Sequence, residues 1–281
     1  MSADERCEPE AYEDGAGSYL VLLHGLGGTW HIWKPVLAAL SGRHRVIAVT
    51  LPGHDGGCVL PAGSEATVAV MADQLIAQLR QRGVTSAHVA GNSLGGWLAL
   101  ELARRGFAKS VVAFSPAGAW STPKDYADIS RSFRILFALM PVIIVLTTAC
   151  LRFAAVRRLL CRPTMEHGDR IPGTEMRAMF HAMNRTRILP ALLETMGRDG
   201  PIAPLDAGLT PIRIVWGGSD RTIPFERYGR PMMQRVAGAD GLTLAGAGHV
   251  PMFDDPQGVG DAILAVTAGV DAGQSGRAAA C

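Results

Sequence analysis

The sequence predicts an α/β fold built on a doubly wound, mostly parallel sheet. Six short runs of Val, Ile, Leu and Ala predict strands, and most runs are continuous, which is typical of a parallel sheet buried on both faces. Helical periodicity fills the gaps, and strands that alternate with helices favour a doubly wound sheet. A long helical segment, about residues 119–209, interrupts this alternation and predicts an insertion.

The elements follow one another in a regular order. Residues 1–17 are expected to form a polar tail and one short edge strand. The other predicted strands are Tyr19–Leu23, Arg45–Val49, Ala87–Ala90, Ser110–Phe114, Ile212–Trp216 and Leu242–Leu244. The helices between them are expected at Ile32–Leu40, Val68–Gln81, Trp97–Arg104, Phe225–Val236 and Gly258–Val266. Residues 1–118 and 210–270 therefore form the predicted core, and residues 271–281 a flexible tail rich in Gly, Ala and Ser.

The segment 119–209 is predicted to be helical throughout. Its prolines divide it into four expected helices, Asp125–Met140, Val142–Leu160, Thr174–Asn184 and Ile188–Gly197. An insertion between two parallel strands lies over the carboxyl edge of the sheet, where open α/β sheets bind their ligands. We therefore interpret this segment as a cap over a binding site.

Within the cap, residues 135–151 carry no charge and are flanked by Arg134 and Arg152. The run is near the lower length limit of a membrane span, about 17–25 residues, and Pro141 divides it. A buried or pocket-lining helix is the favoured interpretation. Arginines follow the apolar run, however, and they leave open a weak contact of the cap with an anionic membrane surface. These are Arg152, Arg157, Arg158 and Arg162.

Composition excludes several classes of protein. The chain has 281 residues, 48% of them hydrophobic and 19% charged, which indicates a globular protein. The net charge is +2 without a long basic block, so nucleic acid is not an expected partner. No apolar signal core lies near the N-terminus, which favours a cytoplasmic protein, peripheral to a membrane if the cap binds one. No pattern indicates the oligomeric state.

The cysteines form no pattern of their own. The five are scattered without a CxxC pair, which predicts reduced thiols and supports the cytoplasmic assignment. They are Cys7, Cys58, Cys150, Cys161 and Cys281. Zinc would need closer clusters of Cys and His, so no metal site is expected.

A serine between glycines carries the strongest chemical signal. Gly91-Asn92-Ser93-Leu94-Gly95-Gly96 lies between a predicted strand and a predicted helix. A serine there stands on a turn so sharp that its neighbours two residues away must be small, and Gly91 and Gly95 meet that demand. The motif therefore predicts a nucleophile, Ser93.

A serine nucleophile needs a base and an acid that orients the base. His249 follows a predicted strand through a glycine-rich loop, and Asp220 stands just past the strand Ile212–Trp216. Asp254 and Asp255 are alternative acids, but they lie five and six residues beyond His249, where the last helix is expected to begin. Three such residues, each just beyond a strand of one sheet, predict a Ser93, Asp220 and His249 triad.

Acyl transfer also needs donors for the developing oxyanion. The backbone N–H of Leu94 opens the helix after the nucleophile and is one candidate. The glycine-rich loop His24-Gly25-Leu26-Gly27-Gly28 offers the N–H of Leu26 as the second. This loop lacks the spacing and the Lys-Ser/Thr of a phosphate-binding loop. His24 is expected to be structural.

With these motifs the chain resembles the α/β-hydrolase superfamily over nearly its whole length. Further matches are Leu51-Pro52-Gly53-His54 and Trp216-Gly217-Gly218-Ser219-Asp220, and the order Ser, Asp, His is that of the superfamily. The resemblance implies an eight-stranded hydrolase sheet, a lid after the sixth strand and no cofactor. Thr50 stands where such proteins usually have an acid. The N-terminal region is too short for the full first hairpin, so one or both leading strands should be missing or reduced.

The leading hypothesis is hydrolysis of a small carboxylic ester with a hydrophobic acyl or ring group, through an acyl-enzyme. The expected pocket residues are Trp30, Trp120, Phe137, Met140 and Val250. Cleavage of a carbon–carbon bond, or of a lactone or an amide, would use the same triad. A binding protein with little turnover is a hypothesis of a different class. Haloalkane dehalogenases and epoxide hydrolases are disfavoured because they use Asp in place of Ser93.

Overall fold

In the computed structural model, which describes residues 8–208 and 210–278, a seven-stranded sheet carries the fold. Its strands are β1 (Ala11–Asp14), β2 (Tyr19–Leu23), β3 (Arg45–Val49), β4 (Ala87–Asn92), β5 (Ala108–Phe114), β7 (Ile212–Gly217) and β9 (Asp240–Leu244). Their spatial order is β1-β3-β2-β4-β5-β7-β9, and all neighbours are parallel except β1, which pairs antiparallel with β3. The prediction of a doubly wound, mostly parallel α/β sheet is confirmed.

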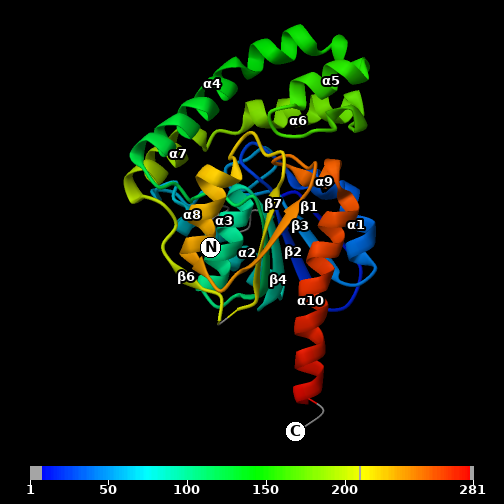
Figure 1. Ribbon diagram of the computed structural model, residues 1–281, viewed down its shortest axis with the longest axis vertical. Coiled ribbons are helices and arrows are strands. Elements are labelled where there is room, and N and C mark those ends of the chain that lie inside the picture. The colour runs from blue at the N-terminus through cyan, green and yellow to red at the C-terminus, as the bar shows by residue number, and fades with distance from the viewer. Residues whose placement is uncertain (1–7, 209, 279–281) are drawn as a thin grey trace.

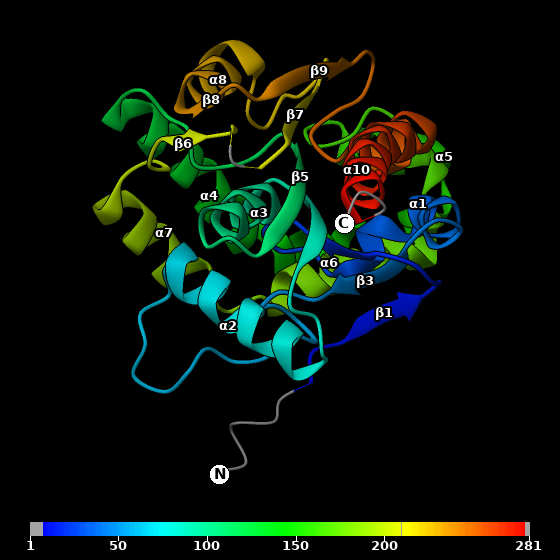
Figure 2. The ribbon, with the colours of Figure 1, turned by 90° about the horizontal axis from the view of Figure 1, so that it is seen from below.

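Helices cover both faces of this sheet (Figure 2). One face carries α1 (Lys34–Ser41) and α10 (Pro256–Ala278), and the other carries α2 (Val68–Gln81), α3 (Leu94–Arg104) and α8 (Arg230–Arg235). The burial of the strands explains their composition: all six residues of β4 and six of seven in β5 are buried. Two apolar cores result, one on each face of the sheet.

The order of the strands also locates the expected ligand-binding site. The chain leaves β2 for β3 on one side and then crosses to β4 on the other side of β2. This reversal leaves a crevice beyond the carboxyl ends of β2 and β4, where ligands bind in open α/β sheets. The loop that begins at His24 follows β2. The sharp turn at Ser93, which we call the elbow, follows β4.

The cap forms the top of the molecule in Figure 1. It consists of α4 (Pro123–Thr147), α5 (Ala154–Cys161), α6 (Gly173–Arg185) and α7 (Leu189–Asp199), with short 3₁₀ turns at Cys150–Arg152 and Gly168–Arg170. It follows β5, the fifth described strand, where the sixth was expected. The difference is one strand of the first hairpin, which was predicted to be reduced: β1 is the one antiparallel partner in the described sheet.

The predicted end of the first cap helix at Pro141 is wrong. Helix α4 continues through Pro141 to Thr147, and the expected helix Val142–Leu160 is replaced by the end of α4, a 3₁₀ turn and the shorter α5. A proline removes one N–H donor and bends a helix, but a long helix anchored at its start tolerates this cost. Thr122 and Asp125 form a capping box that supplies the anchor.

Two other predicted boundaries are wrong. A two-residue strand, β6 (Leu205–Asp206), pairs with β8 (Val236–Ala237) inside the segment that was expected to hold no strand. At the other end, α10 runs to Ala278, so residues 271–278 are helical where a tail was expected, and residues 279–281 lie outside the described part.

A polar cluster ties α10 to the sheet. The His88 ring bonds Ser110 Oγ at 2.8 Å and Asp271 Oδ1 at 3.1 Å, and Ser18 Oγ donates to Asp271 Oδ2 at 2.7 Å. The ring of His44 joins the cluster through Ser18 and Thr267. Composition alone could not reveal that these polar residues, which are far apart in the sequence, lie together. Their hydrogen bonds hold α10 against the sheet.

The cysteines do not follow the prediction of reduced thiols. Cys58 is disulfide-bonded, whereas Cys150 and Cys161 are free. Cys7 and Cys281 lie outside the described residues. The cysteines therefore no longer support a reducing compartment for this protein.

Candidate active site

Ser93 occupies a strained turn between β4 and α3. Its φ is +55° and its ψ is −115°, a backbone conformation that non-glycine residues rarely adopt. A Cβ on Gly91 would lie 2.1 Å from the Gly95 carbonyl oxygen, and one on Gly95 would lie 2.2 Å from the carbonyl oxygen of Leu23. Both positions therefore need glycine, which gives the sequence motif its physical reason.

Asp220 and His249 meet beyond the ends of β7 and β9. His249 Nδ1 lies 2.8 Å from Asp220 Oδ2, and both side chains are almost completely buried. The other carboxylate oxygen accepts hydrogen bonds from the backbone N–H groups of Thr222 and Ile223, each at 2.9 Å. Because a carboxylate only accepts, His249 Nδ1 carries a proton toward Asp220, and Nε2 is left to act as a base.

Asn92 links the loop of His249 to the strand end that precedes Ser93. Its amide nitrogen donates to the carbonyl oxygen of His249 at 2.8 Å and to that of Phe114 at 3.2 Å. The residue directly before Ser93 therefore holds the loop of His249 against the ends of two strands. The motif at Ser93 does not reveal this role of Asn92, because the link joins residues 157 positions apart.

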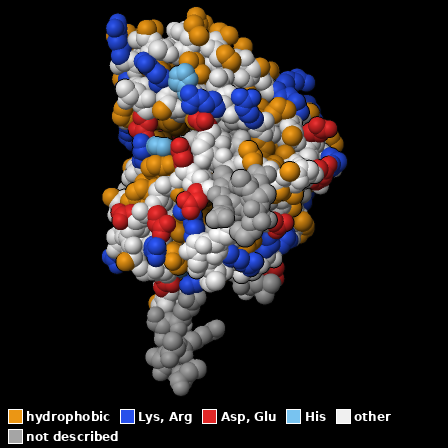
Figure 3. Space-filling view, turned by 180° about the vertical axis from the view of Figure 1, so that it is seen from behind, with side chains coloured by type: hydrophobic (Ala, Val, Ile, Leu, Met, Phe, Trp, Pro, Cys, Tyr) orange, Lys and Arg blue, Asp and Glu red, His pale blue; other side chains and the backbone are white. Residues whose placement is uncertain are grey.

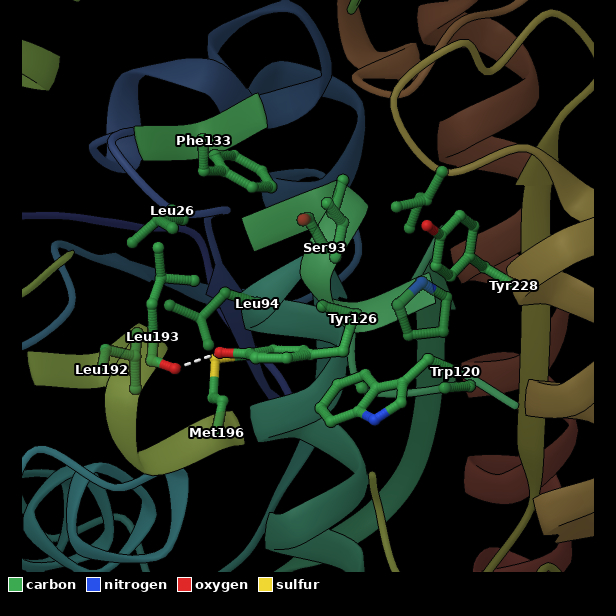
Figure 4. A pocket seen from close by; sticks show the side chains of 16 residues that line it. Leu26, Ser93, Leu94, Trp120, Tyr126, Phe133, Leu192, Leu193, Met196 and Tyr228 are labelled. Carbon is green, nitrogen blue, oxygen red and sulfur yellow. Dashed lines mark hydrogen bonds between the residues drawn. The ribbon is translucent and has the colours of Figure 1, made fainter. Parts of the chain in front are cut away.

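The two expected oxyanion donors lie at the same place. Gly28 N–H donates to the Gly25 carbonyl at 3.0 Å and closes a turn around Leu26, with Gly27 at φ +78°. Leu94 is the first residue of α3, where an N–H has no acceptor within the helix. Leu26, Leu94 and Ser93 line one cavity (Figure 4). This placement suits two donors for a developing oxyanion.

His24 stabilises the loop of residues 24–28 that carries the Leu26 N–H. Its Nε2 accepts from Leu51 N–H at 2.9 Å, so Nδ1 carries the proton and donates to Gly25 O at 2.7 Å. The ring of His54 packs edge-on against it at 4.9 Å. Burial, together with His54, lowers the pKa of His24 well below its usual range, and burial lowers the pKa of His54 to about 4. His24 is structural, as predicted from the sequence.

These buried histidines predict acid sensitivity. The pKa of His54 is lower in the folded chain than in the unfolded chain, so below about pH 6.5 only the unfolded chain takes up the proton. Stability is therefore highest above that pH and falls until about pH 4. His54 alone should lower the free energy of unfolding by about 2 kcal/mol between about pH 7.5 and pH 5. Urea unfolding at the two pH values measures this difference.

The variant His54→Phe isolates the contribution of His54. It keeps an aromatic ring against His24 and removes the titrating group. The difference in unfolding free energy between the two pH values should be smaller than in the wild type. An unchanged difference would contradict the assignment.

The cavity beside Ser93 is small and apolar. Its volume is about 50 Å³, and it lies between the core and the inner face of the cap (Figure 4). Tyr126, Ile129 and Phe133 reach it from α4, and Leu192, Leu193 and Met196 from α7. The core contributes Leu26, Ser93, Leu94, Pro116, Ala117, Gly118, Ala119, Trp120, Ile223 and Tyr228.

Both tyrosine hydroxyls of this cavity are already used by the protein. Tyr126 OH donates to the carbonyl oxygen of Leu193, and Tyr228 OH donates to that of Asp125 at 3.0 Å. No Lys, Arg or His is among the described residues that line the cavity. The group bound there must therefore be uncharged and mostly apolar.

Only part of the predicted pocket lines this cavity. Trp120 does, but Trp30, Phe137, Met140 and Val250 do not. Trp30 stacks against Tyr12 and His31 instead, and Val250 N–H donates to the cap residue Thr164. Phe137 lies against Gly27. On α4 the cavity is reached by Tyr126, Ile129 and Phe133, and Phe137 and Met140 lie further along the helix, past the part that lines it.

Comparison with known proteins agrees with this geometry. Residues 20–262 match the model described as "Alpha/beta hydrolase family". The chain belongs to this family. It is similar to "Epoxide hydrolase EphH" of Mycobacterium tuberculosis, with 32% identity over 67% of this chain and 89% of that protein.

Two solved structures show the same fold as this alpha/beta hydrolase. One is a thermophilic esterase from Thermogutta terrifontis, with a TM-score of 0.72, 20% identity and 93% of each chain covered. The other is a 2-hydroxy-6-oxo-6-phenylhexa-2,4-dienoate hydrolase from a Rhodococcus species, with a TM-score of 0.70 and 20% identity over 92% of this chain and 93% of that one. At such identities the likeness concerns the fold.

In this alpha/beta hydrolase the alternative acid Asp254 has a different position. Its carboxylate accepts from the N–H groups of Gly248 at 2.8 Å, Glu166 at 3.0 Å and His167 at 2.7 Å. Asp254 therefore joins the loop of His249 to the cap, and the ring of His249 bonds Asp220. Its role could not be read from spacing, since two of its three donors are more than 80 residues away.

Proposed function

We propose that the protein is a serine hydrolase that cleaves carboxylic esters with a short, apolar acyl group. The observation that carries the proposal is the apolar cavity of about 50 Å³ that Ser93 and both oxyanion candidates border. After attack the acyl carbon is bonded to Ser93 Oγ, so the acyl group must fit the space beside that atom. One water-sized sphere needs about 10–15 Å³, so the cavity holds about four such spheres in a row or cluster. A carbon of an acyl chain is of similar size, so the space suits an acyl chain of about four carbons.

The geometry supports an acyl-enzyme sequence. Ser93 Oγ attacks the acyl carbon while His249 Nε2 takes its proton, and Asp220 stabilises the resulting imidazolium. The Leu26 and Leu94 N–H groups bind the oxyanion. His249 then gives its proton to the leaving alcohol and activates the water that releases the acid. Lactones and amides would follow the same steps.

The nucleophile argues against epoxide opening, the activity in the name of one relative. Attack of a serine on an epoxide carbon gives an ether, which water does not hydrolyse, whereas attack by a carboxylate gives a hydrolysable ester. The hydroxyls of Tyr126 and Tyr228 both donate to backbone carbonyls and are not free to polarise an epoxide oxygen.

Carbon–carbon bond cleavage and pure ligand binding are less well supported. A dienoate substrate carries a carboxylate, and the described residues of the cavity include no cationic side chain. A binding protein without turnover would not need the buried Asp220–His249 pair, because burying a carboxylate and an imidazole costs free energy unless the pair has a use. An ester hydrolase uses both groups.

A panel of p-nitrophenyl esters and a fluorophosphonate probe test the proposal. The butyrate should be hydrolysed, and the probe should add a single phosphonyl group to Ser93, located by peptide mass spectrometry. If no ester of the panel is hydrolysed and Ser93 stays unlabelled, the ester-hydrolase proposal is wrong.

Acyl-chain length should follow the size of the cavity. We expect kcat/KM for the octanoate to be about tenfold or more below that for the butyrate, because overfilling a packed site costs about 1–3 kcal/mol. Phe133→Ala should raise the octanoate value by enlarging the cavity. Leu139→Ala, on the same helix but half-exposed and outside the cavity, is the matched control and should change neither value. Equal rates for both esters in the wild type would contradict the assignment of the cavity to the acyl group.

A further inference from the structure

The cap has an exposed apolar surface that the active site does not use. We call it the outer cap face. It consists of side chains of α4, α5 and the turn between them, all about half-exposed or more. These are Ile135, Leu139, Val142, Val145, Leu146, Phe153 and Leu159, with exposed fractions of 49–78%.

The outer cap face is a continuous stripe along α4. Ile135, Leu139, Val142 and Leu146 follow one another at spacings of four, three and four residues, which places them on one side of a helix. The opposite side of α4 carries the cavity residues Tyr126, Ile129 and Phe133 near its start. Both sides of the helix are apolar. The cavity accounts for the apolar residues of the inner side, and nothing in the described chain covers those of the outer side.

Length and composition would let α4 cross a membrane, and only 11% of its most apolar window is buried in the described structure. Its first turns are nevertheless fixed to the core. Arg227 pairs with Asp125 and, at 2.6 Å, with Asp128. If α4 crossed a bilayer, these pairs would break and the cavity would lose one wall, so the geometry favours a helix that lies parallel to a surface.

The segment that forms the outer cap face carries charge of one sign, although Asp169 of the following turn lies 3.9 Å from Arg158. Between Asp128 and Glu166 the sequence has six arginines and no acidic residue, although the net charge of the whole chain is only +2. They are Arg131, Arg134, Arg152, Arg157, Arg158 and Arg162. Figure 3 shows hydrophobic and basic side chains together over the cap, at the top of the view. An apolar stripe beside cations is typical of a helix that lies in the interface of an anionic bilayer.

We propose that the outer cap face docks on the surface of a lipid bilayer that contains anionic lipids. Apolar side chains of α4 and α5 enter the boundary between headgroups and acyl chains. The exposed arginines Arg131, Arg134, Arg152 and Arg162 contact lipid phosphates, whereas Arg157 donates to backbone carbonyls and Arg158 lies beside Asp169. A second copy of the chain is a poorer occupant, because pairing this face with itself would bring two sets of six arginines together. The proposal concerns binding and does not depend on the reaction at Ser93.

Vesicle co-sedimentation tests the proposal. The full chain should sediment with vesicles of phosphatidylcholine that contain about 30% phosphatidylglycerol, and much less with phosphatidylcholine alone, because each arginine near an anionic surface changes the partition coefficient about fivefold. Binding should weaken as salt rises toward about 1 M, where charges are screened beyond about 3 Å. Failure to sediment with anionic vesicles at low salt would overturn the proposal.

Two pairs of variants separate the apolar and the charged contributions. Val145→Asp with Leu146→Asp should lower the partition coefficient about tenfold or more, and Val59→Asp, at a side chain that is 67% exposed on the core, should not. Arg131→Gln with Arg162→Gln should lower it on anionic vesicles, whereas Arg80→Gln on α2 should not.

The same variants should keep the wild-type hydrolysis of a soluble butyrate ester, which shows that they fold. If the cap variants bind vesicles as the wild type does, the face is not the docking site. If instead they abolish self-association seen by size exclusion, with no change in vesicle binding, the face joins copies of the chain and the lipid proposal is wrong.

Discussion

Replacing Ser93 by alanine should lower kcat for p-nitrophenyl butyrate by about 10⁴- to 10⁶-fold, the range seen when a triad nucleophile is removed. The exchange deletes one oxygen atom from a buried side chain and leaves its strained backbone conformation unchanged. The oxyanion donors and the cavity remain, so KM should change little. Steady-state kinetics, together with circular dichroism to verify folding, measures the effect.

The control for this variant is Ser64→Ala, which removes an exposed hydroxyl on a surface loop of the core. Its kinetics should equal those of the wild type. If Ser93→Ala keeps more than about a tenth of the wild-type kcat, another group is the nucleophile, because oxyanion binding alone cannot supply that rate.

Asp220→Asn should lower kcat about 10⁴-fold while the fold stays intact. An asparagine oxygen can still accept from Thr222 and Ile223, which each donate to Asp220 Oδ1 at 2.9 Å. The amide nitrogen then faces His249 Nδ1 and donates to it. The imidazole is therefore held with its proton on Nε2, where it cannot accept the proton of Ser93.

The measurement compares kcat and the melting temperature of the variant with those of Asp261→Asn, an exposed exchange on α10 that should change neither. A loss of activity accompanied by a similar loss of stability would show that Asp220 mainly holds the loop together. A variant as active as the wild type would exclude Asp220 as the acid that orients His249.

The fold and the triad could be predicted because their signals are local. Most of the strands are short, parallel and buried on both faces, so they form continuous apolar runs. Each of the six predicted strands shares at least one limit with an observed strand. The elbow needs glycine at positions 91 and 95 because backbone carbonyls lie close to their Cα atoms. Such steric requirements restrict the residue type at a position, and the restriction can be recognised in the sequence.

The cap could not be predicted in the same detail. Pro141 favours a break, yet the capping box at Thr122 and the packing of α4 against α6 keep one helix through it. Which turns of that helix meet the cavity depends on how it packs over the core, so Phe133 lines the cavity and Phe137 does not. Asn92 and Asp254 were missed as positioning residues because their partners lie far away in the chain.

The sequence by itself determined the family and the candidate nucleophile, acid and base, because strand ends and tight turns constrain residue types within a few positions. The tertiary structure alone decided the size and polarity of the cavity and the surface that the cap presents. Those properties depend on which faces of α4 and α7 turn inward, and that is set by packing between segments that sequence spacing does not relate. In the function proposed above, Ser93 supplies the nucleophile and the cap limits the acyl group that reaches it.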